Sequence, residues 1–165
     1  FAAKIGAGDD EVVPAVAAVG YIADRPRALD SVMRRAVGSD RRLPWQDLFF
    51  EGSFSTPLSR EDTGEYAVPL EMLRLGPSAS NKQPWRVVKT GNTWHLFLAR
   101  TKGYGQGILG RNWSRGDMQR LDMGIAMCHF EQTARELGLE GRWVVDQPEI
   151  GELDELTEYT ASWAG

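Results

Sequence analysis

A short polar turn at residues 77–83, Pro-Ser-Ala-Ser-Asn-Lys-Gln, has the chemistry of a ligand-binding segment. Gly76 and Pro77 end an apolar helical run, because proline cannot continue a helix and disfavours one just before it. The turn then offers hydroxyls, an amide and backbone N–H groups. An Asn side chain both donates and accepts hydrogen bonds, so Asn81 could pair with a ring that carries adjacent N–H and C=O groups, such as the pyrimidine edge of a flavin. Taken alone, a turn rich in Ser and Asn is more typical of a capped turn that binds nothing.

Arg41 and Arg42 form a second candidate site, directly before Leu43 and Pro44. A guanidinium can hold a phosphate through two parallel hydrogen bonds, which a lysine does less specifically. The alternative is that both arginines are solvated charges after a helix. The sequence leaves both readings open.

Two other motifs are rejected as sites. Residues 105–110 spell Gly-x-Gly-x-x-Gly, but several residues separate them from the strand expected to end at Ala99, and six more precede the helix expected from residue 117. The dinucleotide fingerprint requires the strand and the helix to adjoin it, so we interpret this segment as a surface loop. His129 has no second His at metal-ligand spacing. We therefore predict no metal site and name no catalytic side chain, and expect His95 to face solvent and Cys128 to be an inert core thiol.

The elements that must position these residues alternate between helical and extended patterns, which predicts an α+β domain. In chain order, we expect a buried strand (11–20), a helix (24–37), a short helix (44–50), a helix that is firm only after Pro69 and ends at Leu75, a hairpin (85–89 and 93–99), a long helix (117–137) and two closing strands (142–145 and 158–163). The hairpin rests on Gly91-Asn92, a favourable two-residue turn.

The long helix has two adjoining apolar stripes and is therefore expected to be buried over most of its girth. One stripe comprises Met123, Met127, Phe130, Ala134 and Leu137, and the other Met118, Leu121, Ile125 and Cys128.

Composition limits the classes of partner. The net charge is −4 over 165 residues, which argues against nucleic acid and anionic membrane surfaces because a polyanion gains nothing from an acidic protein. No apolar stretch approaches the roughly 18 residues of a membrane span. The single Cys128 cannot form an internal disulfide, so we expect a cytoplasmic protein. Residues 1–6 read like the tail of a helix, and we expect a segment before Phe1 to be missing.

Residues 77–85, Pro-Ser-Ala-Ser-Asn-Lys-Gln-Pro-Trp, resemble the flavin-contacting turn of the nitroreductase family. Residues 122–127 through 136–139, with Trp143, resemble that family's long central helix and the strand after it. The order of Val-Val-Pro at 12–14, Arg-Arg-Leu-Pro-Trp at 41–45 and the turn resembles one branch, in which the usual elements are rearranged within a longer chain. The resemblance implies a single nitroreductase-like domain over 1–165, with a mixed or antiparallel sheet flanked by helices and a long buried central helix.

The same resemblance implies an FMN-dependent NAD(P)H oxidoreductase. A hydride from NAD(P)H would pass through the flavin to a nitroaromatic, a quinone or a similar small-molecule acceptor. Flavin pockets in this family lie between two halves of a fold, so a homodimer or an intrachain pseudo-dimer is expected. Arg42 matches a phosphate-binding arginine before Leu-Pro. The implied cofactor contacts are Pro77, Ser78, Ala79, Ser80, Asn81, Gln83, Arg41 and Arg42.

This sequence departs from the family in two places. An Arg-x-Ser-x-Arg element that binds the FMN phosphate and a Gly-rich flavin-facing turn are both missing from these residues. The resemblance therefore implies about half of a cofactor site. Two alternatives remain: a flavin-binding or interaction module without turnover, and a structural relative that has lost flavin.

Overall fold

The computed structural model describes most of the chain after residue 33. The described residues are Lys4, Gly6, Gly8, 19–21, Val32, 34–104 and 117–165. The chain divides into two compact units, residues 1–33 and 34–165, and every helix and strand named below belongs to the second. Most of the strand expected at 11–20, the first part of the helix expected at 24–37 and the Gly-x-Gly-x-x-Gly segment lie outside the described residues.

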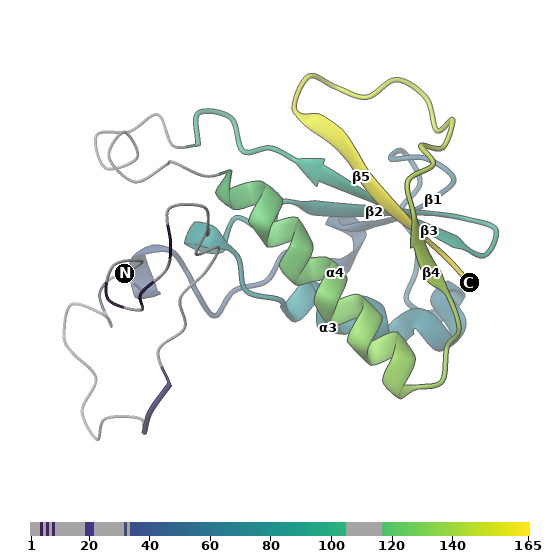
Figure 1. The fold of residues 1–165 in the computed structure, drawn as a ribbon. Coiled ribbons are helices and arrows are strands. Elements are labelled where there is room, and N and C mark those ends of the chain that lie inside the picture. Colours follow the sequence, from purple (N-terminus) through teal and green to yellow (C-terminus); the bar gives the residue numbers. More distant parts are fainter. Residues whose placement is uncertain are drawn as a thin grey trace. The chain divides into compact units, whose positions relative to one another are not determined.

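A five-stranded mixed sheet forms the centre of the second unit, with the strand order β1-β2-β3-β5-β4 (Figure 1). The strands are β1 (Phe49–Glu51), β2 (Trp85–Thr90), β3 (Thr93–Ala99), β4 (Arg142–Val144) and β5 (Thr157–Ala164). β1 runs parallel to β2, and the other neighbours are antiparallel. The predicted α+β class with a mixed sheet is confirmed.

The predicted hairpin between β2 and β3 is also confirmed. Thr90 pairs with Thr93 across a two-residue turn, and Gly91 has a φ of 57° while Asn92 is not left-handed. A positive φ at the first central residue alone is typical of a type II′ turn, which matches the twist of the strands.

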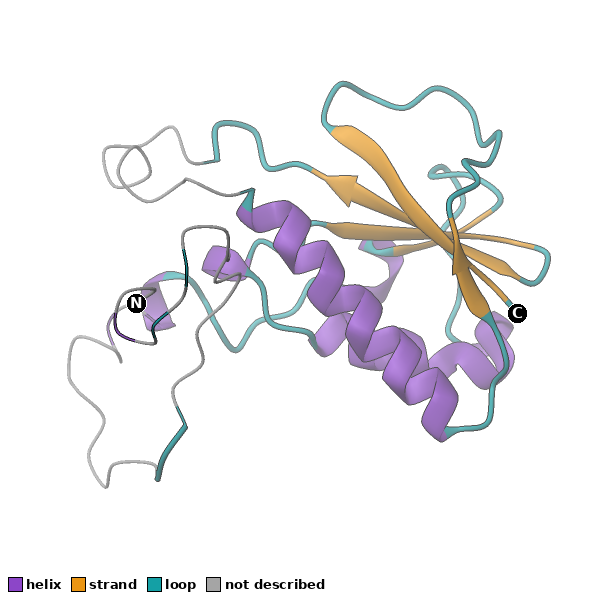
Figure 2. Ribbon diagram, in the orientation of Figure 1, coloured by secondary structure: helices purple, strands orange, loops and turns teal. Residues whose placement is uncertain are grey.

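Two α-helices, α3 (Ala67–Leu75) and α4 (Met118–Glu136), lie against the sheet (Figure 2). Shorter 3-10 turns are η1 (Trp45–Asp47), η2 (Glu61–Tyr66) and η3 (Ala79–Asn81). The predicted ends of α4 hold: the Asp117 carboxylate accepts from the Arg120 N–H, and the Leu139 N–H donates to the Ala134 carbonyl in a Schellman ending.

Two local predictions were wrong. The short helix expected at 44–50 is only the three-residue η1, because Phe49 instead pairs with Val87 and is fully buried in β1. Pro69 lies inside α3 and not before it. It is the third helical residue, where the backbone N–H has no partner within the helix, so proline costs no hydrogen bond there.

Aromatic side chains fill the space between the helices and the sheet. Phe130 of α4 stacks on Tyr66 with ring centroids 5.8 Å apart, and its ring meets Trp163 of β5 edge-on at 5.8 Å. Trp85 at the start of β2 is fully buried in the same core. This cluster ties the last strand of the chain to α4.

Only one of the two apolar stripes of α4 is buried, so the expectation of a helix buried over most of its girth is only partly met. Phe130 and Ala134 are inaccessible to solvent, whereas Leu121 is 48% exposed. Cys128 is also exposed, and its predicted place in the core was wrong. Within the described residues, α4 packs on the sheet and on α3 from one side, which leaves the second stripe uncovered.

His95 faces away from α4 but does not reach solvent, contrary to expectation. Its Nδ1 lies 2.7 Å from the Ser162 hydroxyl and its Nε2 2.6 Å from the Thr90 hydroxyl. Burial lowers the pKa of His95. His95 pairs with Ser162 of β5, so the two side chains lie on the same face of the sheet. The sequence of β3 alone gives no sign of that neighbour.

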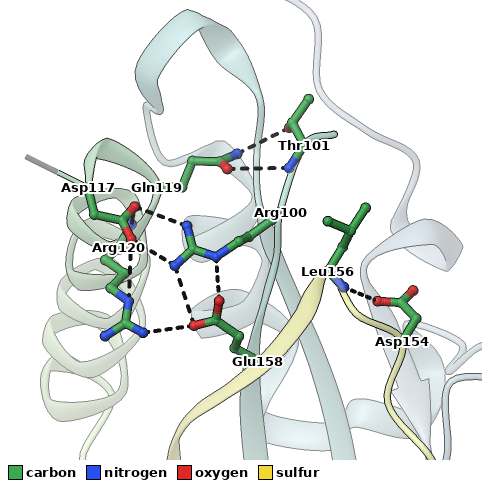
Figure 3. A network of polar contacts seen from close by, with 8 residues as sticks. All are labelled: Arg100, Thr101, Asp117, Gln119, Arg120, Asp154, Leu156 and Glu158. Atoms are coloured by element: carbon green, nitrogen blue, oxygen red, sulfur yellow. Dashed lines mark hydrogen bonds and ion pairs between the residues drawn. The ribbon is translucent and has the colours of Figure 1, made fainter. Parts of the chain in front are cut away.

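A charged cluster fixes the start of α4 to the ends of two strands (Figure 3). The Arg100 guanidinium, just after β3, donates to Asp117 at 2.7 Å and to Glu158 on β5. These hydrogen bonds from Arg100 hold the pKa values of both carboxyls below their ordinary range. The cluster therefore sets where α4 begins relative to the sheet.

The described residues contain no helix with the length and apolar character needed to cross a bilayer. Within the same residues, no group of three or more His, Cys, Asp or Glu side chains is placed to hold a metal ion.

Truncating Phe130 to alanine should lower the free energy of unfolding by about 3–5 kcal/mol, because a fully buried ring leaves a cavity. Leu121→Ala on the exposed stripe of the same helix is the matched control and should cost less than about 1 kcal/mol. Urea denaturation measures both. Equal losses would contradict the one-sided burial of α4.

Replacing Arg100 with methionine should remove part of the acid sensitivity of the fold. The lowered carboxyl pKa values stabilise the native chain above the ordinary values of 4.5 for Glu158 and 3.8 for Asp117, and this contribution is lost as the pH falls through the folded-state values. At neutral pH the free energy of unfolding of the variant should be about 1 kcal/mol lower than that of the wild type, as expected for partly exposed pairs. On acidification, its free energy of unfolding should fall by less than that of the wild type. Urea denaturation across pH, with exposed Arg142→Met as control, measures this. An unchanged acid profile in Arg100→Met would refute it.

Candidate functional site

The turn after α3 is held in an unusual backbone conformation. Ser80, Asn81 and Gln83 have φ values of 52°, 53° and 49°. A left-handed conformation costs a residue other than glycine roughly 1–2 kcal/mol, and such residues persist only where the surroundings fix them. The turn is therefore a rigid feature that its neighbours must maintain.

Two hydrogen bonds fix the start of the turn. The Ala79 N–H donates to the Asp122 carboxylate of α4, at 2.9 Å from Oδ1 and 3.1 Å from Oδ2. The Ser78 hydroxyl accepts from the Gln83 N–H at 2.8 Å and so closes the turn on itself. Asp122 is 1% exposed, and burial raises the pKa of its carboxyl.

Gln83 joins the turn to the segment that carries the two arginines. Its side chain is 4% exposed, and its Oε1 accepts from the Leu43 N–H at 2.8 Å. Its Nε2 donates to the Asn81 carbonyl at 3.3 Å. Residues 40 positions apart in sequence are thus hydrogen-bonded, and the two sets of residues suggested by the sequence lie side by side.

Asn81 binds the same segment through its amide. Its Nδ2 donates to the Gly38 carbonyl at 2.6 Å and to the Arg41 carbonyl at 3.0 Å. Its Oδ1 lies 3.4 Å from Nη1 of Arg42. Both N–H groups of this amide therefore satisfy backbone carbonyls, so this side chain has a structural role in the conformation described.

Arg42 is also engaged by the protein. Nε and Nη2 donate to the Leu75 carbonyl at 3.3 and 3.1 Å, and Nη1 donates to the Ser39 carbonyl at 2.8 Å. The guanidinium thus links the end of α3 to the segment before Leu43. A phosphate at Arg42 would compete with these carbonyls.

Three exposed polar side chains remain available around the turn. Within the part of the chain that the structure describes, Arg41, Ser80 and Lys82 make no side-chain hydrogen bond or ion pair. They supply two cations and a hydroxyl beside backbone that is already fixed. This donor set suits an anionic ligand with further hydrogen-bonding groups, such as a phosphate-bearing cofactor.

Sequence reasoning identified the turn and both arginines but missed Asp122 as part of the site. Pro77 is exposed and leads into the turn, and Ala79 contributes its backbone N–H. The sequence did contain one sign of a buried role for Asp122. It is an acidic residue directly before Met123, and Met123 belongs to the stripe of α4 that faces the core.

A separate cavity of about 330 Å³ shares no residue with the turn. It is lined by Asp62, Thr63, Gly64, Glu65, Tyr66, Lys89, Gly91, Asn92, Trp94 and Gly165. Lys89 is already engaged there, with its ammonium over the Trp94 ring and 3.2 Å from the Asp62 carbonyl. The cavity offers no free cation for a phosphate, so we place the candidate site at the turn.

Asn81→Gly should destabilise the chain in the absence of any ligand, because two backbone carbonyls lose their donor. The expected loss is about 1–2 kcal/mol in urea denaturation. Ser80→Gly is the matched control, since its φ of 52° nearly equals the 53° of Asn81 and its side chain makes no hydrogen bond to the described residues. If both variants lost the same stability, the structural role of the Asn81 amide would be wrong.

Comparison with known families places the chain in one of them. A family model described as "Putative TM nitroreductase" matches residues 3–134, which is most of the chain and includes Arg41, Arg42, the turn and α4 as far as Ala134. Searches of curated proteins and of solved structures gave no match. The resemblance inferred from the sequence is confirmed, and the chain belongs to this nitroreductase family of oxidoreductases, in which flavins are the general cofactors.

Proposed function

We propose that this chain is an FMN-dependent NAD(P)H oxidoreductase of nitroreductase type, acting on nitroaromatic, quinone or similar small-molecule acceptors. The observation that carries the proposal is the turn at 77–83, fixed by its hydrogen bonds, beside Arg41, Ser80 and Lys82, which are exposed and have no side-chain partner among the described residues. A preformed backbone with free donors lowers the ordering cost of binding. The family membership supports the choice of a flavin over other phosphate-bearing ligands.

The residues would have distinct roles in holding FMN. Arg41, whose guanidinium is exposed and unpaired among the described residues, is the preferred phosphate contact, with Arg42 kept mainly for the backbone. Ser80 would donate its hydroxyl to the ring or the ribityl chain. Ser78, Asn81 and Gln83 would fix the turn, and Pro77 and Ala79 would border the ring.

Bound FMN would supply the transfer of electrons between NAD(P)H and the acceptor. The protein would bind and orient the cofactor, exclude water and place positive charge beside it. Lys82 and Arg41 are the exposed cations that this part of the chain offers for that purpose. No side-chain acid or base is required.

In the same proposal, a homodimer partner or another part of a pseudo-dimeric chain contributes the second half of the flavin pocket. The exposed stripe of α4, with Met118 at 40% and Leu121 at 48% exposure, supports a further packing partner. A reducing compartment such as the cytoplasm fits the single free Cys128.

An FMN titration followed by flavin fluorescence tests the proposed site. The chain should bind FMN, and Arg41→Ala should weaken the affinity about tenfold through loss of a charge-assisted hydrogen bond. Arg142→Ala on β4 removes one exposed positive charge elsewhere and should leave the affinity unchanged. Absence of FMN binding, or equal affinity in the two variants, would contradict the proposed phosphate contact.

An anaerobic experiment separates turnover from binding. The FMN-loaded chain should bleach on addition of NADH or NADPH and recover its absorbance when a nitroaromatic or a quinone is added. Stable yellow colour without bleaching would overturn the enzymatic proposal and favour the module that binds flavin without turnover.

A further inference from the structure

Asp122 is a buried carboxylate, and among the described residues its one hydrogen-bond donor is the Ala79 backbone N–H. Its side chain is 1% exposed, and both oxygens lie within 3.1 Å of the Ala79 nitrogen. Within the described residues it forms no ion pair with Arg, Lys or His. Burying a carboxylate that has no cation among the described residues is costly, so packing alone does not account for an aspartate at this position.

The contact joins a helix with a buried face to a turn that has left-handed backbone. α4 is fixed by its buried face, with Ala126 and Phe130 inaccessible to solvent one and two turns after Asp122. The turn contains left-handed Ser80, one residue after the N–H that Asp122 accepts. An anchor on α4 therefore acts directly at the residue that precedes the strained conformation.

Among the described residues, no other side chain accepts a hydrogen bond from the Ala79 end of the turn. Gln83 and Asn81 fix the far end, toward the segment at 38–43. The Ser78 hydroxyl accepts from Gln83, which closes the loop internally but does not attach it to a helix. Loss of Asp122 would leave the Ala79 N–H without its acceptor and the first half of the turn without a tether to α4.

We propose that Asp122 is a positioning residue, which holds the Ala79 N–H so that Ser80 and its neighbours are preformed for a phosphate-bearing flavin. This inference rests on the proposed function for its ligand, but the tether itself is a property of the chain without ligand. The role requires a hydrogen-bond acceptor and not a negative charge. Asparagine, whose Oδ1 can accept from the same N–H, should therefore replace Asp122, whereas alanine should not.

Two measurements on the full chain test the proposal. The first is amide hydrogen exchange of Ala79 by NMR without FMN, and the second is the FMN dissociation constant by flavin fluorescence. Asp122→Ala should speed exchange at Ala79 and raise the dissociation constant, each about tenfold, which corresponds to one lost hydrogen bond. Asp122→Asn should keep both values within about threefold of the wild type.

Gln119→Ala is the matched control. Gln119 is 3% exposed on the same helix and is hydrogen-bonded to Thr101 at 3.1 Å, away from the turn. It should leave Ala79 exchange and FMN affinity unchanged, which separates the tether from a general weakening of α4. Circular dichroism verifies that each variant is folded.

Three outcomes would overturn the proposal. The first is an unchanged rate of Ala79 amide exchange in Asp122→Ala. The second is that Asp122→Ala and Gln119→Ala change Ala79 exchange and FMN affinity equally. The third is that Asp122→Asn loses as much exchange protection at Ala79 as Asp122→Ala does. Failure of the proposed function is distinguishable, because the wild-type chain would then bind no FMN while the exchange measurement still reports on the tether.

Discussion

The packing of one face of α4 on the sheet is the constraint on which the other features of this unit depend. Phe130 and Ala134 are fully buried in that contact, and the ring of Phe130 meets both Tyr66 and Trp163. Burial of large aromatic surfaces dominates the energetics of such a core. Once α4 is placed, its N-terminal half brings Asp117 to Arg100 and Asp122 to the turn.

The side-chain hydrogen bonds around the turn are explained by the need to satisfy backbone polar groups. Left-handed Ser80, Asn81 and Gln83 cannot form a regular ladder, and the segment at 38–43 is irregular as well. Buried N–H and C=O groups without partners are costly. The amides of Asn81 and Gln83 and the guanidinium of Arg42 meet that demand through hydrogen bonds to the backbone.

Because Arg42 and Asn81 are hydrogen-bonded to the backbone, their roles differ from the ligand contacts that the sequence suggested for them. The resemblance implies phosphate binding by Arg42, yet its guanidinium is occupied by the Leu75 and Ser39 carbonyls, while the guanidinium of Arg41 is exposed. Asn81 is likewise engaged with the backbone. The residues of the motif build the platform, and the exposed side chains beside it are the ones free to meet a ligand.

Local sequence signals were sufficient wherever neighbouring residues decide the structure. The Gly91-Asn92 turn predicted the β2–β3 hairpin, and the long helix expected at 117–137 agrees with α4, because these features depend on hydrogen bonds between residues close in sequence. The motif at 77–85, taken together with the long-helix pattern at 122–139, predicted the family. It could not predict β1, because Phe49 is extended through pairing with a strand almost forty residues away.

By itself, the sequence determined the α+β class, the main elements after residue 66 and the family. The tertiary structure decided that His95 is buried, that Cys128 is exposed and that Arg41, Ser80 and Lys82 are exposed without a side-chain partner among the described residues. It also decided that Asp122 holds the turn. Periodicity tells which side of an element a residue occupies, but burial and hydrogen-bond partners depend on what packs against that side, and those partners come from distant parts of the chain.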